Sequence, residues 1–469
     1  MRFKEQRLED LCELVIDCPH STPKWTDKGF IVLRNQNIRN GVLDLSAPSF
    51  TDEDGYKSRI KRAKPRVNDI VFTREAPMGE VCLIPEGIDC CLGQRQVLLR
   101  ANNEIDPYYL FWALQSPYVQ HQISWNEGTG TTVSNVRIPV LKDLKIPRLG
   151  GHESWIAKTM TSLALKSQIN EKINQTLEQM AQALFKSWFV DFEPVKAKMA
   201  VREAGGSQEA ATLAAMTAIS GKNADVLAVF ERGHPEQYAE LKATAELFPS
   251  AMQDSEIGNI PEGWHVSDLS EVASLNAESW SKKNAPESVS YVDLANTKWG
   301  VINSVETYQF SDAPSRARRI LKPHDTIVGT VRPGNGSYSY INKTGLTGST
   351  GFAVLTPKAR VFSEYIYLCV TSNESIERLA HLADGGAYPA VNADVVLSTQ
   401  CVLPVALEIR EAVLNIFSSR TDMFFSYRAN GLSQNEMLLK IRDTLLPKLL
   451  SGEITLPEAE QAVSEAENV

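Results

Sequence analysis

The sequence lacks the features that mark secreted, membrane-bound and metal-dependent proteins. It begins Met1-Arg-Phe-Lys-Glu with no apolar leader, and no apolar run approaches the roughly 20 residues that span a bilayer. Its 7 cysteines form no Cys-x-x-Cys pair, and its 7 histidines form neither His-x-His nor His-Glu-x-x-His. We therefore expect a cytoplasmic protein with reduced, mostly buried thiols, no membrane span and no metal site.

The motifs of common catalysts are also missing. A phosphate-binding loop needs Gly-x-x-x-x-Gly-Lys-Ser/Thr, but the only Gly-Lys pair, Gly221-Lys222, is followed by asparagine. No glycine-rich turn lies between a strand and a helix in the way that a dinucleotide requires. One pattern fits a nuclease: Asp225 with Glu240 and Lys242 could hold Mg²⁺ and a water. It lies in an alanine-rich helical segment with no strand to fix its geometry, so a nuclease is the least favoured alternative.

What the sequence does contain is enough apolar residues for several cores. The chain has 469 residues, of which 43% are hydrophobic, and this length is typical of more than one domain. Acidic residues outnumber basic ones by 57 to 48, for a formal net charge of −9. The excess is local, because residues 201–262 hold ten acids against four bases and residues 451–469 hold five acids and no base. The remainder is close to neutral, so the net charge argues only weakly against an anionic partner.

The sequence contains an internal duplication. Four pairs of residues mark the repeat at displacements of 256 to 258 residues: Asp10 and Asp268, Pro77 and Pro333, Asn135 and Asn392, Pro147 and Pro404. Each copy has short β-type runs between Gly and Pro, then a short aromatic helix, a closing strand that ends in Pro, and a long helix. We therefore predict the α/β (α+β) fold class, with two homologous mixed α/β domains separated by long antiparallel coiled-coil helices.

Apolar residues at steps of three and four follow each copy, which is the spacing of a coiled-coil seam. An amphipathic helix packed only on its own domain is the alternative, but two such helices in duplicate positions favour a mutual pair. At about 1.5 Å per residue, such a pair would act as a ruler between the domains. The predicted interface of the pair comprises Ile169, Ile173, Leu177, Met180 and Leu184 on the first helix, and Val413, Ile416, Leu438, Ile441 and Leu445 on the second.

These patterns divide the chain into six segments. They are a first mixed domain (1–150), a first spacer helix (151–200), a helical acidic insertion or linker (201–258), a second mixed domain (259–406), a second spacer helix (407–450) and an acidic tail (451–469).

Basic residues cluster at equivalent positions of the two copies. One such cluster is usually a solvated face, but two at the repeat displacement favour phosphate neutralisation. The candidates for phosphate contact are Lys57, Arg59, Lys61, Arg62 and Lys64 in the first copy, and Arg316, Arg318 and Arg319 in the second.

Beside each basic cluster lies a loop with side chains suited to base edges or grooves. Arginine can pair with guanine, and asparagine or glutamine with adenine. The loops differ between copies while the framework agrees, as two modules reading different sequences should. The candidates for base or groove contact are Arg74, Gln94, Arg95, Gln96, Arg332, Asn335 and Tyr338.

Three stretches carry a resemblance to a known family. They are the Trp-containing run 184–195 at the end of the first helix, the run Gly258-Asn-Ile-Pro-Glu-Gly-Trp264 that opens the second copy, and the run 445–454 that closes the second helix. In these runs and in its duplicated organisation, the chain resembles the specificity (S) subunit of type I restriction-modification systems.

The resemblance implies two target-recognition domains that each read one half of a split site in double-stranded DNA. In the family, the two helices also dock two methylation subunits, and restriction subunits join them. S-adenosylmethionine, ATP and Mg²⁺ would then be expected on those partner subunits and not on this chain, which would be non-catalytic. A protein-binding scaffold whose duplicated domains recognise peptides is the second alternative.

Overall fold

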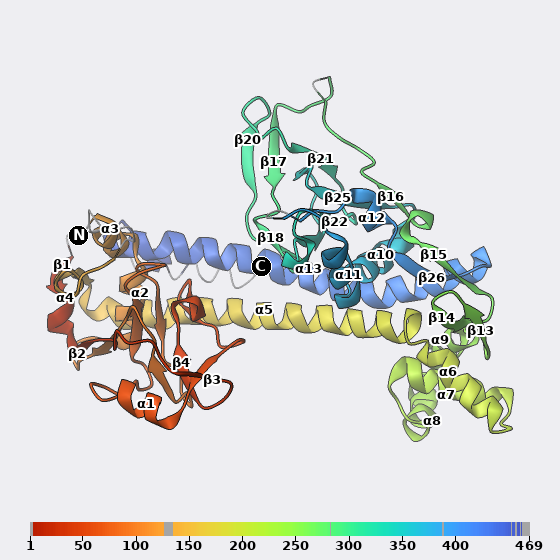
Figure 1. Ribbon diagram of the computed structural model, residues 1–469, viewed down its shortest axis with the longest axis horizontal. Coiled ribbons are helices and arrows are strands. Elements are labelled where there is room, and N and C mark those ends of the chain that lie inside the picture. Colours follow the sequence, from red (N-terminus) through yellow and green to blue (C-terminus); the bar gives the residue numbers. More distant parts are fainter. Residues whose placement is uncertain are drawn as a thin grey trace. The chain divides into compact units, whose positions relative to one another are not determined.

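The computed structural model describes residues 3–125, 135–281, 283–386, 389–451, 453–454, 457–459 and 461. The chain forms two compact units, one made of residues 1–171 and 432–469 and the other of residues 172–431 (Figure 1). Most of the predicted acidic tail, 451–469, lies outside the described residues.

The first unit contains two four-stranded sheets formed by the first copy of the repeat. One has the order β2-β11-β8-β9 with antiparallel neighbours, and the other has the order β10-β4-β7-β3 with β10 and β4 parallel. Two short pairs, β1-β12 and β5-β6, complete the copy. The strands are β1 (Lys4–Arg7), β2 (Cys12–Asp17), β3 (Trp25–Thr26), β4 (Phe30–Leu33), β5 (Ile38–Arg39), β6 (Val42–Leu43), β7 (Ser49–Thr51), β8 (Ile70–Thr73), β9 (Val81–Leu83), β10 (Cys90–Leu92), β11 (Gln96–Ala101) and β12 (Lys145–Arg148).

Short helices pack on both sheets of the first unit, with α2 against the antiparallel sheet and α1 against β10 of the other sheet. Pro107 occupies the first position of α2, and the Asp106 carboxylate caps that helix by accepting hydrogen bonds from the backbone N–H groups of Tyr108 and Tyr109. Because α2 is buried on nearly all sides, it forms the centre of this unit's core. The helices are α1 (Glu53–Arg59), α2 (Pro107–Gln115), α3 (Pro117–Trp125) and α4 (Ile138–Asp143).

The second unit repeats this arrangement. Its sheets have the orders β16-β25-β22-β23 and β20-β17-β24-β21, again with one parallel pair, β17 and β24. The strands are β15 (Trp264–Asp268), β16 (Ala273–Leu275), β17 (Ser288–Val292), β18 (Thr297–Lys298), β19 (Val301–Ile302), β20 (Glu306–Gln309), β21 (Ala317–Leu321), β22 (Thr326–Gly329), β23 (Tyr338–Tyr340), β24 (Leu346–Ser349), β25 (Phe352–Pro357) and β26 (Gln400–Pro404). The helices are α10 (Ser363–Val370), α11 (Asn373–Leu382) and α12 (Ala393–Leu397).

The two copies agree in the pairing of their antiparallel sheets and closing strands, and they differ at the edges of the mixed sheets, where β3 pairs with β7 in the first copy and β21 pairs with β24 in the second. The sheet β16-β25-β22-β23 is the counterpart of β2-β11-β8-β9, and the pair β15-β26 is the counterpart of β1-β12. A tyrosine hydroxyl donates to the closing strand in each copy, from Tyr109 to the Pro147 carbonyl (2.7 Å) and from Tyr365 to the Val402 carbonyl (3.2 Å). The predicted duplication is therefore confirmed at the level of individual hydrogen bonds, and the predicted fold class with it.

The connector between the copies is a cluster of short helices and a hairpin. The helix predicted over 151–200 is in fact two helices, because α5 ends at Phe189 and Phe192 adopts a left-handed backbone (φ 54°) before α6 begins. Trp188 is fully buried and packs on Phe248 and Phe417, so the connector is joined to the helix core. Its elements are α6 (Glu193–Glu203), α7 (Gln208–Ser220), α8 (Ala224–Gly233), α9 (Pro235–Glu246), β13 (Met252–Ser255) and β14 (Gly258–Pro261).

The long helices are α5 (Glu153–Phe189) and α13 (Leu407–Ser451). The seam predicted for the first helix is wrong at three of its five residues, because Ile169, Ile173 and Met180 are 58%, 49% and 48% exposed. Leu177 and Leu184 are half-buried. The buried face instead runs through Ile156, Met160, Leu163, Ser167, Asn174, Ala181, Phe185 and Trp188. On α13 the predicted residues lie on the packed face: Val413, Leu438 and Leu445 are buried, and Ile416 and Ile441 are half-buried.

The middle of the buried helix face is polar. In the first unit, the Asn170 amide donates to the Asn435 side-chain oxygen (3.1 Å). In the second unit, Arg428 pairs with Glu178 (3.4 Å). Asn174 is 5% exposed, and its amide has no hydrogen-bond partner in the described part of the chain. A search for apolar periodicity therefore misses this stretch and selects the more hydrophobic exposed face.

Candidate nucleic-acid interface

The first basic cluster lies on α1 and the segment that follows it, and one member is structural. Arg59 is 6% exposed, and its guanidinium donates four hydrogen bonds, to the carbonyls of Leu92 (2.6 Å), Ser21 (3.0 Å), Pro19 (3.1 Å) and Gly93 (2.9 Å). Burial lowers the pKa of this guanidinium. Arg59 is thus not available to a phosphate, which corrects the prediction made for it.

The other members of the first cluster are exposed. Lys57 pairs with Glu53 (2.6 Å) and Lys64 with Asp89 (3.0 Å), which partly neutralises both. Arg62 donates to the backbone carbonyl of Asp17 (3.3 Å). Lys61 is exposed as well, so Lys61 and Arg62 are the members whose charges are least offset by acids.

The second basic cluster precedes and enters β21. Arg316 is 61% exposed and lies 3.4 Å from Asp293. Arg318 stacks over the Phe310 ring at 4.8 Å from its centroid. Arg319 is half-buried, and burial lowers the pKa of its guanidinium. Of the three, Arg316 is the one most open to solvent.

Two of the residues predicted to contact bases in the first copy are structural instead. Arg74 follows β8, but its side chain is only 12% exposed, pairs with Asp17 (3.0 Å) and donates to the Val136 carbonyl (3.0 Å). Gln96 is fully buried, and its side-chain oxygen accepts from the Gly93 N–H (3.0 Å). Both side chains shape the loops and do not present an edge to a ligand, so these two predictions are corrected.

Gln94 and Arg95 do lie on the surface of the turn between β10 and β11. Gln94 donates to the His20 carbonyl (2.8 Å), and Arg95, which is 55% exposed, pairs with Glu75 (3.1 Å). Arg95 also has a left-handed backbone (φ 66°), which is uncommon for a residue other than glycine. The structure therefore brings a polar and a cationic side chain together at one edge of the first unit.

An exposed aromatic near this edge was missed by sequence reasoning. Trp25 is 45% exposed, and the Arg34 guanidinium lies over its ring at 5.3 Å from the centroid. Such a pair offers a flat cationic and aromatic surface. Its signal in the sequence was a tryptophan next to charged residues in a polar stretch.

In the second copy, the predicted base-contact loop follows β22. Arg332 and Asn335 are exposed, and Arg332 has a left-handed backbone (φ 49°). Tyr338 is different: it is 8% exposed, belongs to the core, and burial raises the pKa of its hydroxyl to about 12. Tyr338 therefore packs in the core and supports the loop, and the prediction that it contacts a base or groove is wrong.

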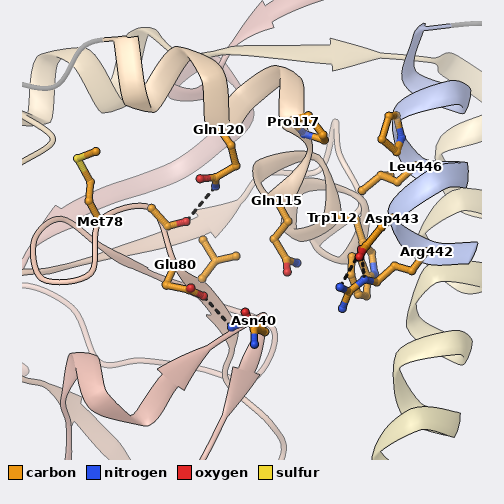
Figure 2. A pocket seen from close by; sticks show the side chains of 13 residues that line it. Asn40, Met78, Glu80, Trp112, Gln115, Pro117, Gln120, Arg442, Asp443 and Leu446 are labelled. Atoms are coloured by element: carbon orange, nitrogen blue, oxygen red, sulfur yellow. Dashed lines mark hydrogen bonds and ion pairs between the residues drawn. The ribbon is translucent and has the colours of Figure 1, made fainter. Parts of the chain in front are cut away.

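The first unit also has a cavity of about 290 Å³ beside the Asn40–Gly41 turn, between the mixed domain and α13 (Figure 2). Glu80 accepts from the Asn40 backbone N–H (2.7 Å), and Gln120 donates to the Gly79 carbonyl (3.0 Å). Because these side chains already bind the backbone, the cavity has few polar groups left to orient a small molecule. We assign no ligand to it.

The long helices leave apolar side chains uncovered. Leu165 and Ile169 of the first unit, and Ile173 and Met180 of the second, are about half exposed along α5, at 48–58%. On α13, Met423 is 54% and Tyr427 is 61% exposed. Apolar residues at helical spacing on a solvent-facing side are typical of surfaces that contact another protein.

The remaining sequence-based candidates are dispersed. Asp225 and Glu240, the residues of the nuclease alternative, are exposed on α8 and α9. Within the described residues, no three His, Cys, Asp or Glu side chains gather as a metal ion would require. No described helix combines the length and apolar character needed to cross a bilayer. All seven cysteines are free; six are buried and Cys12 is half-buried.

The sequence is similar to known proteins. Residues 2–179 match the family model of the type I restriction modification DNA specificity domain. The type I restriction enzyme HindI specificity subunit of Haemophilus influenzae is 32% identical over 311 residues, which cover 64% of this chain and 66% of that subunit, slightly less than two thirds of its length. The MjaIX specificity subunit of Methanocaldococcus jannaschii is 26% identical over 400 residues, covering 83% of this chain and 78% of that subunit.

Among solved structures, the S subunit of a type I restriction-modification system from M. genitalium aligns over 95% of this chain and 96% of its own, with 16% identity and a TM-score of 0.48. The sequence matches, and not this structural likeness, decide the assignment. Residues 2–179 belong to the family of type I restriction modification DNA specificity domains, and the chain is similar to the type I specificity subunits named above.

Proposed function

We propose that this chain is the DNA-recognition subunit of a type I restriction-modification complex and that each copy of the repeat reads one half of a bipartite site. The observation that carries the proposal is the duplication itself. One framework of sheets and helices occurs twice in the chain, with equivalent loops that hold different side chains. Two copies of one framework with unlike loops are suited to reading two unlike sequences on the same kind of ligand.

The equivalent loops support the assignment of one half-site to each copy. Glu75, after β8, forms an isolated bridge with Asn135, and Val331, after β22, forms one with Ala390. The backbone of both loops is therefore held in the same way, while the exposed side chains differ. Arg95 and Gln94 are offered in the first unit, and Arg332 and Asn335 in the second. These are side-chain types that can hydrogen-bond to base edges in the major groove.

We propose further that the chain is non-catalytic and works through partners. The uncovered apolar residues of α5 and α13 would meet two methylation subunits, to which restriction subunits would join. S-adenosylmethionine, ATP and Mg²⁺ would then be bound by those partners. This chain would supply the sequence specificity, and the two helices would set the spacing between the half-sites.

The exposed basic residues provide a direct test of DNA binding. We expect the double variant Lys61→Ala/Arg62→Ala, in complex with the methylation subunits, to bind all DNA sequences more weakly. The slope of log affinity against log salt concentration should fall by about one unit for each lost phosphate contact. Fluorescence anisotropy at several salt concentrations measures this slope.

The matched control for this test is Lys242→Ala, which removes an exposed lysine from α9 in the acidic connector. We expect its salt slope to equal that of the unaltered protein. If Lys61→Ala/Arg62→Ala also leaves the slope unchanged, the first basic cluster does not contact phosphate.

A further inference from the structure

The β18–β19 hairpin of the second unit ends in a turn of unusual composition. The two central residues are Trp299 and Gly300, with φ of 46° and 80°. A two-residue hairpin turn with both φ values positive prefers Asn-Gly. The equivalent hairpin of the first unit, β5–β6, has that preferred pair, since Asn40 and Gly41 have φ of 51° and 81°.

Tryptophan is a poor residue for this backbone conformation. A bulky side chain at positive φ brings its β-carbon close to the neighbouring peptide, which is why such outliers concentrate at functional positions. Burial of the ring does not compensate, because Trp299 is 57% exposed. The second copy therefore holds an aromatic ring at the surface in a turn where its sister copy holds asparagine.

The loop after β22 is shaped to carry this ring. The Trp299 N–H donates to the Gly336 carbonyl (2.7 Å), and the Gly300 N–H donates to the Tyr338 carbonyl (2.9 Å). The ring lies directly on Gly336, where an added β-carbon would be 2.5 Å from a ring atom. Tyr338 meets the ring edge-on at 6.0 Å between centroids. Only glycine at 336 leaves room for the ring.

The turn is also fixed from its inner side. Arg428 of α13, which is 6% exposed, donates to the Gly300 carbonyl (2.8 Å) and pairs with Glu178 of α5 (3.4 Å). A β-carbon on Gly300 would lie 2.2 Å from the Arg428 guanidinium. Both sides of the turn are thus held, and Trp299 is presented by a rigid support.

The surroundings of the ring suit an anionic ligand. Lys298 donates to the Ser337 hydroxyl (3.1 Å), and Arg332 and Asn335 lie in the same loop. The two segments that form the tip, residues 294–305 and 326–342, contain no aspartate or glutamate. Cationic and aromatic side chains without acids are the combination that nucleic-acid surfaces use.

We propose that Trp299 contacts DNA at the second half-site by laying its indole ring against a base step. The proposal rests on the function proposed above and adds a specificity residue to it. Aromatic and apolar side chains can partly unstack a base step, and the gain depends on how easily that step deforms. Trp299 would therefore favour half-sites with a flexible step beneath it, a contribution that the first copy does not make through Asn40.

The variant Trp299→Asn tests this contact, because asparagine is the residue that the turn prefers. We expect its melting temperature to equal or exceed that of the unaltered protein. In complex with the methylation subunits, the variant should bind a duplex that carries the site methylated by the complex roughly 10-fold more weakly than the unaltered protein does. On a duplex whose second half-site is scrambled, the two proteins should bind equally. Trp299→Phe retains an aromatic ring and should keep most of the affinity.

The outcomes separate the inference from the function on which it rests. Unchanged affinity of Trp299→Asn for the complete site, with normal site-specific binding by the unaltered complex, overturns the role of Trp299 alone. Loss of the methylation subunits from purified Trp299→Asn would show that the ring contacts protein, which also overturns it. Absence of any site-specific binding by the unaltered complex would overturn the proposed function together with this inference.

Discussion

Exchanging residues 4–147 for the first domain of another type I specificity subunit is expected to change one half of the methylated DNA sequence and leave the other half unchanged. In the β1–β12 pair, Glu5 lies opposite Pro147, so both ends of the exchanged segment are neighbours. Arg148 stays in place and keeps its ion pair with Glu153 at the start of α5 (2.9 Å). Mapping methylated adenines in cells that express the hybrid measures the result.

The matched control is the reciprocal exchange in the second copy. Trp264 lies opposite Pro404 in the β15–β26 pair, so residues 264–404 can be exchanged in the same way. We expect this hybrid to change only the other half of the site. If either single exchange alters both halves, the two copies do not read DNA independently and the two-module account is wrong.

Replacing Arg59 by alanine is expected to destabilise the first unit by about 3 kcal/mol or more, without acting primarily on DNA. The variant removes four hydrogen bonds from a buried guanidinium and leaves backbone carbonyls near Pro19 and Leu92 without donors. Hydrogen bonds to charged groups are stronger than neutral ones, and unpaired buried acceptors add to the loss. Urea unfolding, followed by a probe in the first unit, measures the change.

Lys61→Ala is the control for Arg59→Ala, because Lys61 is two residues away and exposed. Its free energy of unfolding should stay within about 0.5 kcal/mol of the unaltered value. The opposite pattern, in which Arg59→Ala keeps its stability but loses affinity for DNA, would restore Arg59 to the set of phosphate contacts.

The duplication could be predicted from the sequence because its markers occupy positions that the backbone constrains. Pro147 is the last but one residue of β12 and Pro404 is the last residue of β26, and each lies opposite the first strand of its copy, at Glu5 and Trp264. Such positions tolerate few residue types, so they remain similar in both copies while the rest diverges. The order of strands and helices then followed from local patterns.

The seam of the long helix could not be predicted because its centre is polar. Ser167 and Asn174 are 8% and 5% exposed, whereas Ile169 is 58% exposed. A periodicity argument assigns the apolar face to the interior, and here the most regular apolar face of α5 is the outer one. An uncovered apolar face is itself informative, since it is where the proposed methylation subunits would be expected to bind.

The candidate site was only partly predictable. The sequence does not show whether a charged side chain contacts solvent or buried carbonyls. The acceptors of Arg59 lie 33 to 40 residues away in the sequence, and the partner of Arg74, Asp17, is 57 residues away. Gln96 and Tyr338 are also buried, where they support loops. The exposed rings of Trp25 and Trp299 were overlooked because tryptophan is usually counted toward the core.

We propose that one chain carries two independent DNA-recognition domains held by a helix pair. Mapping methylated adenines by long-read sequencing, in cells that express this chain with its methylation subunits, tests it most directly. The account predicts one split motif: two short, unlike specific halves separated by a spacer of fixed length and free sequence. Methylation at a single continuous motif, or none that depends on this chain, would contradict it.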